Sequence, residues 1–263
     1  DTFTQLLAGA LPASMEPWAR HGLGLANYAI GRHDEAVVAA CRRHLGGLAP
    51  GAEATCEPAR FDQQAPRYQY VRDSGSQCSV SVLFRGVSEL DPDYMAFVAL
   101  LRAIDDGMST PLHYQLCDQK GLAYSVQAGL EPLADVVLLE VSGQTAQAKV
   151  PALIEGILTL IGAAREQPPT MDELAKIKRR YRYDLLASID DSGAMAGWFG
   201  GTALYYPPPS LTVRLAQMDA VTAADIAAVA RKVVRPERLA VALVGPLTRA
   251  RQGELRAAVM GWH

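Results

Sequence analysis

The 263-residue sequence lacks the paired ligands of a hydrolytic zinc site. No two of its five histidines lie three or four positions apart; they are His21, His33, His44, His113 and His263. One helical turn therefore cannot present two imidazoles to the same ion, as the H-E-x-x-H and H-x-x-E-H motifs do. The four cysteines include no C-x-x-C pair, so we expect free thiols. We predict no metal site and no catalytic residue in this chain.

Long apolar runs and an excess of one charge are also missing. Apolar stretches such as 136–139 and 158–164 end far short of the roughly 20 residues that span a bilayer, so no transmembrane helix is expected. The formal net charge of -3 gives no general reason to bind nucleic acid or a membrane. With 49% hydrophobic residues, the chain can fill one large or two small cores. Because Asp1 is not a start methionine and no signal-peptide pattern follows it, we expect a mature product or an excised segment.

Three short patterns suggest chemistry, but each has a simpler structural explanation. His33 precedes an Asp-Glu pair at 34–35 that suits the positive end of a helix dipole. His113 and Cys117 have helical spacing, yet a thiol nucleophile also needs an oriented base and an oxyanion site, so we favour coincidence. The basic run at 176–182 alternates with apolar residues at helical spacing, which favours a solvated helix face over a nucleic-acid site.

Five segments after residue 60 are predicted to form strands, and one of them alternates apolar and polar residues as a half-buried strand does. The alternating segment is 77–85, and we expect it to form a hairpin with 68–72 through an Asp-Ser-Gly-Ser turn at 73–76. The remaining strands are expected at 122–130, 135–142 and 239–244, the first two joined by a Glu-Pro-Leu-Ala turn.

Helical periodicity and capping residues mark the segments between these strands. Helices are expected at 34–45, 91–106, 109–120, 150–161, 170–185, 222–233 and 251–260. Gly107 and Gly121 are expected to end the second and third of these helices, and Thr170 with Glu173 forms a capping box. Residues 194–206 form a helix or turn that stops at a run of three prolines. Strand pairs separated by helices predict an α+β fold, with an antiparallel sheet flanked by helices.

One pattern occurs twice. A strand at 25–31 and a helix at 34–45 resemble the later strand at 239–245 and helix at 251–260. With a Pro-, Ala- and Gln-rich stretch at 49–66 between them, we interpret the chain as the tail of one unit, a linker and a complete second unit. The predicted domains are a lead-in and linker at 1–60 and an α+β domain at 61–263.

Two segments, Asp106–Leu112 and Lys120–Val126, resemble the second, inactive domain of pitrilysin/insulinase-type zinc peptidases, including the mitochondrial processing peptidases. The resemblance continues in order through 172–176, 221–226 and 239–246, and residues 23–50 resemble the strand and helix that lead into that domain. It implies one half of a clamshell that faces a zinc-bearing half with an inverted H-x-x-E-H helix. Peptide is held between the halves.

In that family an Arg and, seven residues on, a Tyr reach toward the substrate. Tyr124 matches the Tyr and is the predicted substrate-binding residue, although it could also pack beside Val126 as an ordinary strand residue. Cys117 occupies the Arg position and cannot offer a fixed cation to a developing oxyanion. Trp198 and Phe199 either line the chamber or belong to the core.

The resemblance therefore implies a non-catalytic domain that completes a peptide-binding chamber, in part by pairing an extended peptide with an exposed strand edge. The alternative is a structural or assembly subunit like the core proteins of respiratory complexes. On either reading the chain alone is inactive, holds no cofactor, and meets its zinc only in a catalytic half, in the same natural chain or a separate subunit. A homo-oligomer is a further possibility, and among compartments the periplasm is favoured.

Overall fold

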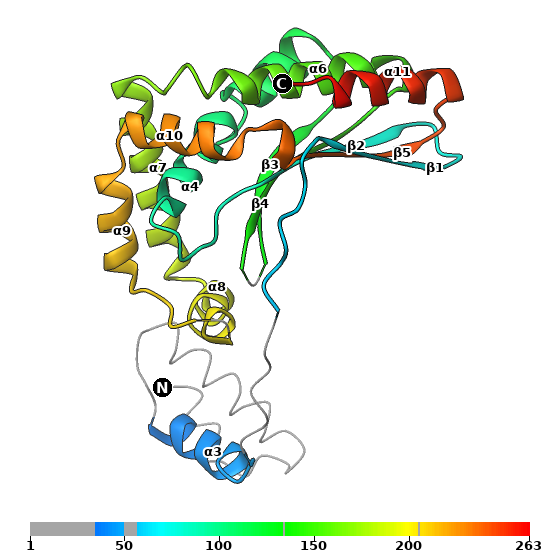
Figure 1. Ribbon diagram of the computed structural model, residues 1–263. Coiled ribbons are helices and arrows are strands. Elements are labelled where there is room, and N and C mark those ends of the chain that lie inside the picture. Colours follow the sequence, from blue (N-terminus) through cyan, green and yellow to red (C-terminus); the bar gives the residue numbers. More distant parts are fainter. Residues whose placement is uncertain (1–34, 50–56, 134, 205) are drawn as a thin grey trace. The chain divides into compact units, whose positions relative to one another are not determined.

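The computed structural model describes residues 35–49, 57–133, 135–204 and 206–263 (Figure 1). It divides into two compact units. The larger comprises residues 57–182 and 210–263 and holds the sheet, whereas the smaller is built from residues 1–56 and 183–209. The strand expected at 25–31 lies outside the described residues. The domain division at residue 60 stays a prediction.

A five-stranded sheet forms the centre of the larger unit. Its strands are β1 (Arg67–Arg72), β2 (Cys78–Arg85), β3 (Val126–Pro132), β4 (Val137–Thr145) and β5 (Leu239–Gly245), in the order β1-β5-β2-β4-β3. Neighbours pair antiparallel except β1, which runs parallel to β5. The predicted α+β class and the hairpin of β3 with β4 are confirmed, and the sheet is mixed rather than wholly antiparallel.

The hairpin predicted between β1 and β2 is wrong, because β5 lies between them. Leu243 of β5 is opposite Tyr70 on one side and Val80 on the other. β5 buries Leu239, Val241 and Leu243, so a central place in the sheet suits its apolar sequence. The loop from β1 to β2 has only to cross one intervening strand, a span of about 10 Å at the usual strand spacing.

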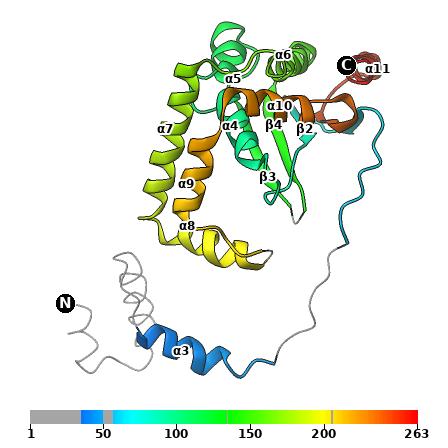
Figure 2. The ribbon, with the colours of Figure 1, turned by 60° about the vertical axis from the view of Figure 1, so that its left-hand side comes forward.

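Helices cover one face of this sheet (Figures 1 and 2). The helices of the larger unit are α4 (Tyr94–Ile104), α5 (Pro111–His113), the π-helix η1 (Tyr114–Gln119), the 3-10 turn η2 (Gln147–Lys149), α6 (Val150–Ala163), most of α7 (Met171–Ser188), α9 (Leu211–Ala220), α10 (Ala223–Val233), the 3-10 turn η5 (Pro236–Arg238) and α11 (Arg249–Met260). The smaller unit has α3 (Glu35–Leu45), α8 (Ser192–Ala196), η3 (Gly197–Gly201) and η4 (Thr202–Leu204). None of the helices in the described part of the chain has the length and apolarity needed for a bilayer crossing.

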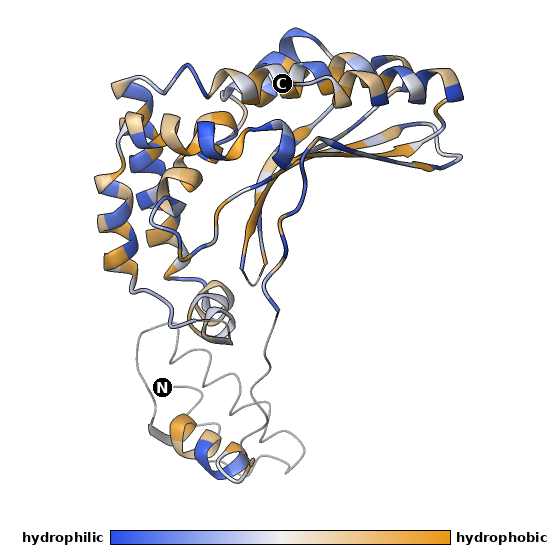
Figure 3. Ribbon diagram, in the orientation of Figure 1, coloured by the Kyte–Doolittle hydropathy of each residue, from blue (hydrophilic) through white to orange (hydrophobic). Residues whose placement is uncertain are grey.

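The core lies between the sheet and these helices, where apolar residues concentrate in Figure 3. Alternate residues of β2 point into it, so that Val80, Val82 and Phe84 are fully buried. Phe97 of α4 and Ile157 of α6 are equally buried and belong to the same cluster. The hydrophobic effect thus anchors one face of every central strand and leaves the alternate residues for the other face.

Several helix ends follow the predicted signals. The Thr170–Glu173 capping box is confirmed, with the Glu173 N–H 3.3 Å from the Thr170 hydroxyl and the Thr170 N–H 2.8 Å from the Glu173 carboxylate. Thr222 and Asp225 form a second one at the start of α10. Gly121, with a φ of +56° that favours glycine, follows η1 and its cap Lys120 directly and ends this helix as expected. The prediction for Gly107 is wrong, because α4 already ends at Ile104 with Asp105 as its C-cap; Gly107 (φ +109°) lies in the loop beyond.

Candidate functional site

The face of the sheet that points away from the core carries most of the polar side chains of β2 and β4. On β2 and β4 it presents Ser79, Ser81, Glu140, Ser142 and Gln144, the residues that alternate with the buried ones. Gln127 of β3 lies directly opposite Ser142. Ser, Gln and Glu side chains thus share this face with the apolar residues Leu83, Leu138 and Val244.

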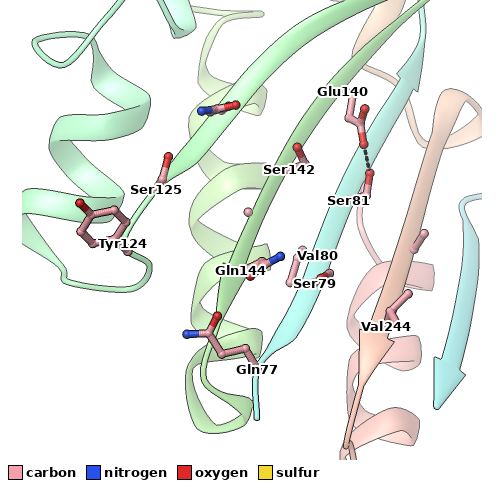
Figure 4. Close-up of a pocket in the computed structure, with 13 residues that line it drawn as sticks. Gln77, Ser79, Val80, Ser81, Tyr124, Ser125, Glu140, Ser142, Gln144 and Val244 are labelled. Atoms are coloured by element: carbon pink, nitrogen blue, oxygen red, sulfur yellow. Dashed lines mark hydrogen bonds between the residues drawn. The ribbon is translucent and has the colours of Figure 1, made fainter. Parts of the chain in front are cut away.

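These residues line a hollow of about 660 Å³ that crosses four neighbouring strands (Figure 4). Its lining consists of Gln77, Ser79, Val80, Ser81, Tyr124, Ser125, Gln127, Glu140, Ser142, Gly143, Gln144, Ala242 and Val244. Glu140 is the one charged side chain in this lining, and it accepts a hydrogen bond from the Ser81 hydroxyl. The hollow therefore offers many neutral hydrogen-bonding groups around a single carboxylate.

Tyr124 lies at the rim of the hollow, just before β3 (Figure 4). Its side chain is 98% exposed. The alternative that Tyr124 packs beside Val126 is therefore wrong, whereas its contact with substrate stays a prediction. An exposed aromatic ring with a hydroxyl tip can contact both apolar and polar parts of a ligand.

The backbone that carries Tyr124 is held firmly. The Leu122 N–H donates to the Leu116 carbonyl at 2.8 Å, and the Leu122 carbonyl accepts from Thr145 at 2.5 Å. Lys149 donates to the Gly121 carbonyl at 2.6 Å. Gly143 of β4 allows the backbone at Ser125 to approach closely, because a Cβ at position 143 would lie 3.0 Å from the Ser125 carbonyl oxygen. The exposed ring thus projects from a fixed base.

Cys117 and His113 each contact a polar group of another residue. Its sulfur accepts a hydrogen bond from the Val126 N–H, and burial raises the pKa of the thiol. A raised pKa lowers the thiolate fraction on which nucleophilicity depends. His113 places Nδ1 3.6 Å from the Asp118 carboxylate. These separate contacts suit the interpretation that the helical spacing of His113 and Cys117 is a coincidence.

Two N–H groups on the outer edge of β3 already have partners. The Val126 N–H points to Cys117, and the Ala128 N–H donates to the Asp105 carboxylate at 2.7 Å. Pro132 has no N–H to offer. Pairing of an extended peptide needs free main-chain donors, and two of those on this edge are already engaged. The expected use of an exposed strand edge stays a prediction.

The basic run of α7 fastens the helix to its neighbours. Lys178 donates to the Asp219 carbonyl at 2.7 Å, and Arg182 pairs with the Asp219 carboxylate. Arg180 lies 3.3 Å from the Asp106 carboxylate, and the other cations of the run are exposed. These contacts fit the solvated helix face that the periodicity favoured.

The aromatic pair of the smaller unit has an intermediate environment. Trp198 is half-buried and donates to the Pro209 carbonyl at 3.0 Å, whereas Phe199 is exposed to 45%. Their place in a chamber stays a prediction. Among the described residues, no group of three or more His, Cys, Asp and Glu side chains could hold a metal ion.

Sequence reasoning missed Ser81, Glu140 and Ser142 as candidate site residues. They lie on strands about 60 residues apart in the chain, and only the β2–β4 register brings them together. The available signal was the set of polar residues that alternate with the buried ones on each strand. These residues share one face of the sheet and could have been considered as a binding surface.

Comparisons with known proteins agree with this fold. The family model described as the Peptidase M16 inactive domain matches residues 28–181. An uncharacterized zinc protease of Streptomyces coelicolor is 26% identical over 201 residues, covering 76% of this chain and 44% of that protein. A Peptidase M16 inactive domain from Pseudomonas fluorescens superposes with a TM-score of 0.68 at 22% identity, over 81% of this chain and 51% of that one.

The same fold occurs in a different assembly. A chain of complex III from Candida albicans superposes with a TM-score of 0.69 at 16% identity, covering 85% of this chain and 57% of that chain. The family match spans more than half of the sequence, so this chain belongs to the family of Peptidase M16 inactive domains. The resemblance stated from the motifs is thereby confirmed. The chain spans about half the length of the relatives it matches.

Proposed function

We propose that this chain forms the non-catalytic wall of a peptide-binding chamber, with the polar face of its sheet turned toward the peptide. The observation that carries the proposal is the hollow on that face with Tyr124 exposed at its rim. A fully exposed tyrosine on a fixed backbone suits a contact with a partner molecule, because little conformational entropy is lost when it binds.

The chemistry of the hollow suits an extended peptide. Main-chain amides need both donors and acceptors, and the Ser and Gln side chains around Ser142 supply both. Because two N–H groups of the β3 edge are engaged, side chains of the sheet face would supply most of the contacts with the peptide. This arrangement tolerates varied peptide sequences, since most of the contacts are neutral.

Bond cleavage would take place on a second, zinc-bearing half, which belongs either to the same natural chain or to a separate subunit. That half would hold the metal, and this chain would supply Tyr124 and the hollow. Cys117, engaged with the Val126 N–H, offers the reacting carbonyl no cation. We also propose that the protein acts in the periplasm and that it can self-associate.

Peptide binding tests the proposal directly. A fluorescein-labelled, acetylated decapeptide of Ala, Gln and Ser would be titrated with the chain and followed by anisotropy. Saturable binding that weakens about tenfold in Tyr124→Ala is expected, because a contacting tyrosine at an interface contributes on the order of 1–2 kcal/mol. Tyr114→Ala is the matched control: Tyr114 is 50% exposed and does not line the hollow.

A structural subunit is the second candidate function. It is favoured by the fold shared with a chain of complex III and by the Cys117 thiol at the position of the family's Arg. It predicts tight association with a partner protein and no saturable binding of the decapeptide. Unchanged peptide affinity in Tyr124→Ala would contradict the chamber proposal and support this second candidate.

A further inference from the structure

We propose that Glu140 is a specificity-determining residue of the hollow, and that it selects peptides that place a cationic group against the polar sheet face. The inference rests on the proposed function and adds the chemical class of ligand. The cationic group is a Lys or Arg side chain or the free amine of a peptide N-terminus, which share the same hydrogen-bonding chemistry.

Position is the first argument. Glu140 lies on β4, the strand next to the β3 edge, with Leu83 of β2 opposite it on one side and Gly129 of β3 on the other. Gly129 has no side chain to cover the carboxylate from the β3 side. A ligand in the hollow can therefore reach Glu140, which is only partly buried.

The second argument is orientation. The Ser81 hydroxyl donates to one carboxylate oxygen of Glu140 (Figure 4). A carboxylate accepts about four hydrogen bonds, so this contact fixes the side chain and leaves most of its acceptor capacity for a ligand. Preorganisation of this kind reduces the entropy lost on binding.

The third argument is the absence of an internal competitor. Within the described ranges, no salt bridge of the chain includes Glu140. Arg85 lies on the same face of β2, but its guanidinium is 5.1 Å from the centre of the Phe61 ring and donates to the Ala59 carbonyl at 3.0 Å. Arg67 pairs with Asp62. The cations of this face are thus engaged elsewhere.

The energetic consequence is selective. An apolar ligand group beside Glu140 would displace water from a carboxylate without replacing its hydrogen bonds, which is unfavourable. A cation would restore those hydrogen bonds in a charge-assisted form, about twice as strong as neutral ones. Acidic groups would be repelled. Glu140 is the one charged group in the lining. Glu131 adds charge of the same sign just outside it, since its carboxylate lies 3.9 Å from where a Cβ on Gly129 would stand.

Four labelled nonapeptides of Ala, Gln and Ser would test the inference. Three are acetylated and carry Lys, norleucine or Glu at the centre, and the fourth has norleucine with a free N-terminal amine. We expect the Lys peptide to bind the chain about fivefold more tightly than its norleucine counterpart, as for a partly exposed ion pair. An equal gain for the fourth peptide would show that the terminal amine is also accepted.

Two variants locate the effect. Glu140→Gln keeps an acceptor for Ser81 but removes the charge, and it should abolish the fivefold preference while the norleucine peptide still binds. Glu155→Gln removes the same charge from an exposed position of α6 in the helical layer, and it should leave the preference intact.

The outcomes separate the two proposals. Equal binding of the Lys and norleucine peptides, or a preference that survives Glu140→Gln, would overturn the role of Glu140 and leave the chamber proposal standing. Failure of all four peptides to bind would overturn the chamber proposal, and the role of Glu140 with it.

Discussion

The two faces of the sheet differ in burial and in polarity, although the same strands build both. On β2, Val80 and Val82 are buried beneath the helices, whereas Ser79 and Ser81 line the hollow on the other face. Successive side chains of a strand point to opposite faces, so neighbouring residues contribute either to core packing or to the chemistry of the open surface. The covered face should therefore control stability and the open face should control binding, and substitutions can test this division.

The largest effect is expected from the covered face. Phe84 is fully buried, and its ring packs edge-on against Trp262 with centroids 5.6 Å apart. Phe84→Ala should lower the free energy of unfolding by about 3–5 kcal/mol, because it removes buried apolar surface and leaves a cavity. Urea denaturation followed by circular dichroism measures this loss. A loss below about 1 kcal/mol would show that the covered face is not the main source of stability.

A smaller effect on stability is expected at Gly143, which packs against the backbone that carries Tyr124. A Cβ at Gly143 would lie 3.0 Å from the Ser125 oxygen and 3.2 Å from a methyl group of Val126. Gly143→Ala should cost on the order of 1–2 kcal/mol through overpacking, and it should also weaken peptide binding by displacing the base of Tyr124. Stability and peptide affinity are measured on the same sample. A loss of stability with unchanged affinity would separate Gly143 from the site.

Acid should act on the helical layer. Hydrogen bonds from Thr222 lower the pKa of Asp225, and those from Thr170 lower the pKa of Glu173. A lowered folded-state pKa means that the stabilisation is present above the unfolded-state pKa and is lost as the pH falls through the folded-state value. Thermal melting between pH 7 and pH 3 should show a smaller loss in Asp225→Asn than in the unmodified chain. Identical pH profiles would contradict this assignment.

The smallest effect on stability is expected from the open face. Ser79 is exposed and lines the hollow. Ser79→Ala should change the free energy of unfolding by less than about 0.5 kcal/mol, as is usual for surface positions. Its effect should fall on peptide affinity, measured by the anisotropy titration. A large loss of stability would show that the open face also contributes to folding.

Local patterns in the sequence were sufficient for most elements of the fold. The alternation in β2, the stripe of α6 and the capping box at Thr170 depend on neighbours within a few residues, and each predicted its element. The start of β3 was placed too early, at 122, because Leu122 and Ala123 are apolar but belong to the loop that positions Tyr124. Only the register of distant strands could correct such boundaries.

Non-local pairing was beyond the same patterns. Nothing in residues 68–85 indicates that a strand more than 150 residues later separates β1 from β2. The motif resemblance identified Tyr124, whose exposure no periodicity could reveal. Glu140 and Ser81 became a site only through the β2–β4 pairing, which explains why the hollow was not predicted.

The late position of β5 in the chain has a consequence for how the protein is made. On the ribosome, β1 through β4 emerge long before residues 239–245. Until then β1 lacks β5, its one partner in the sheet of the described residues, and β2 has one side unpaired. Contacts between residues so far apart in the sequence slow folding, and unpaired strand edges that promote aggregation stay exposed for longer. Synthesis that stopped before β5 would release a chain in need of a chaperone.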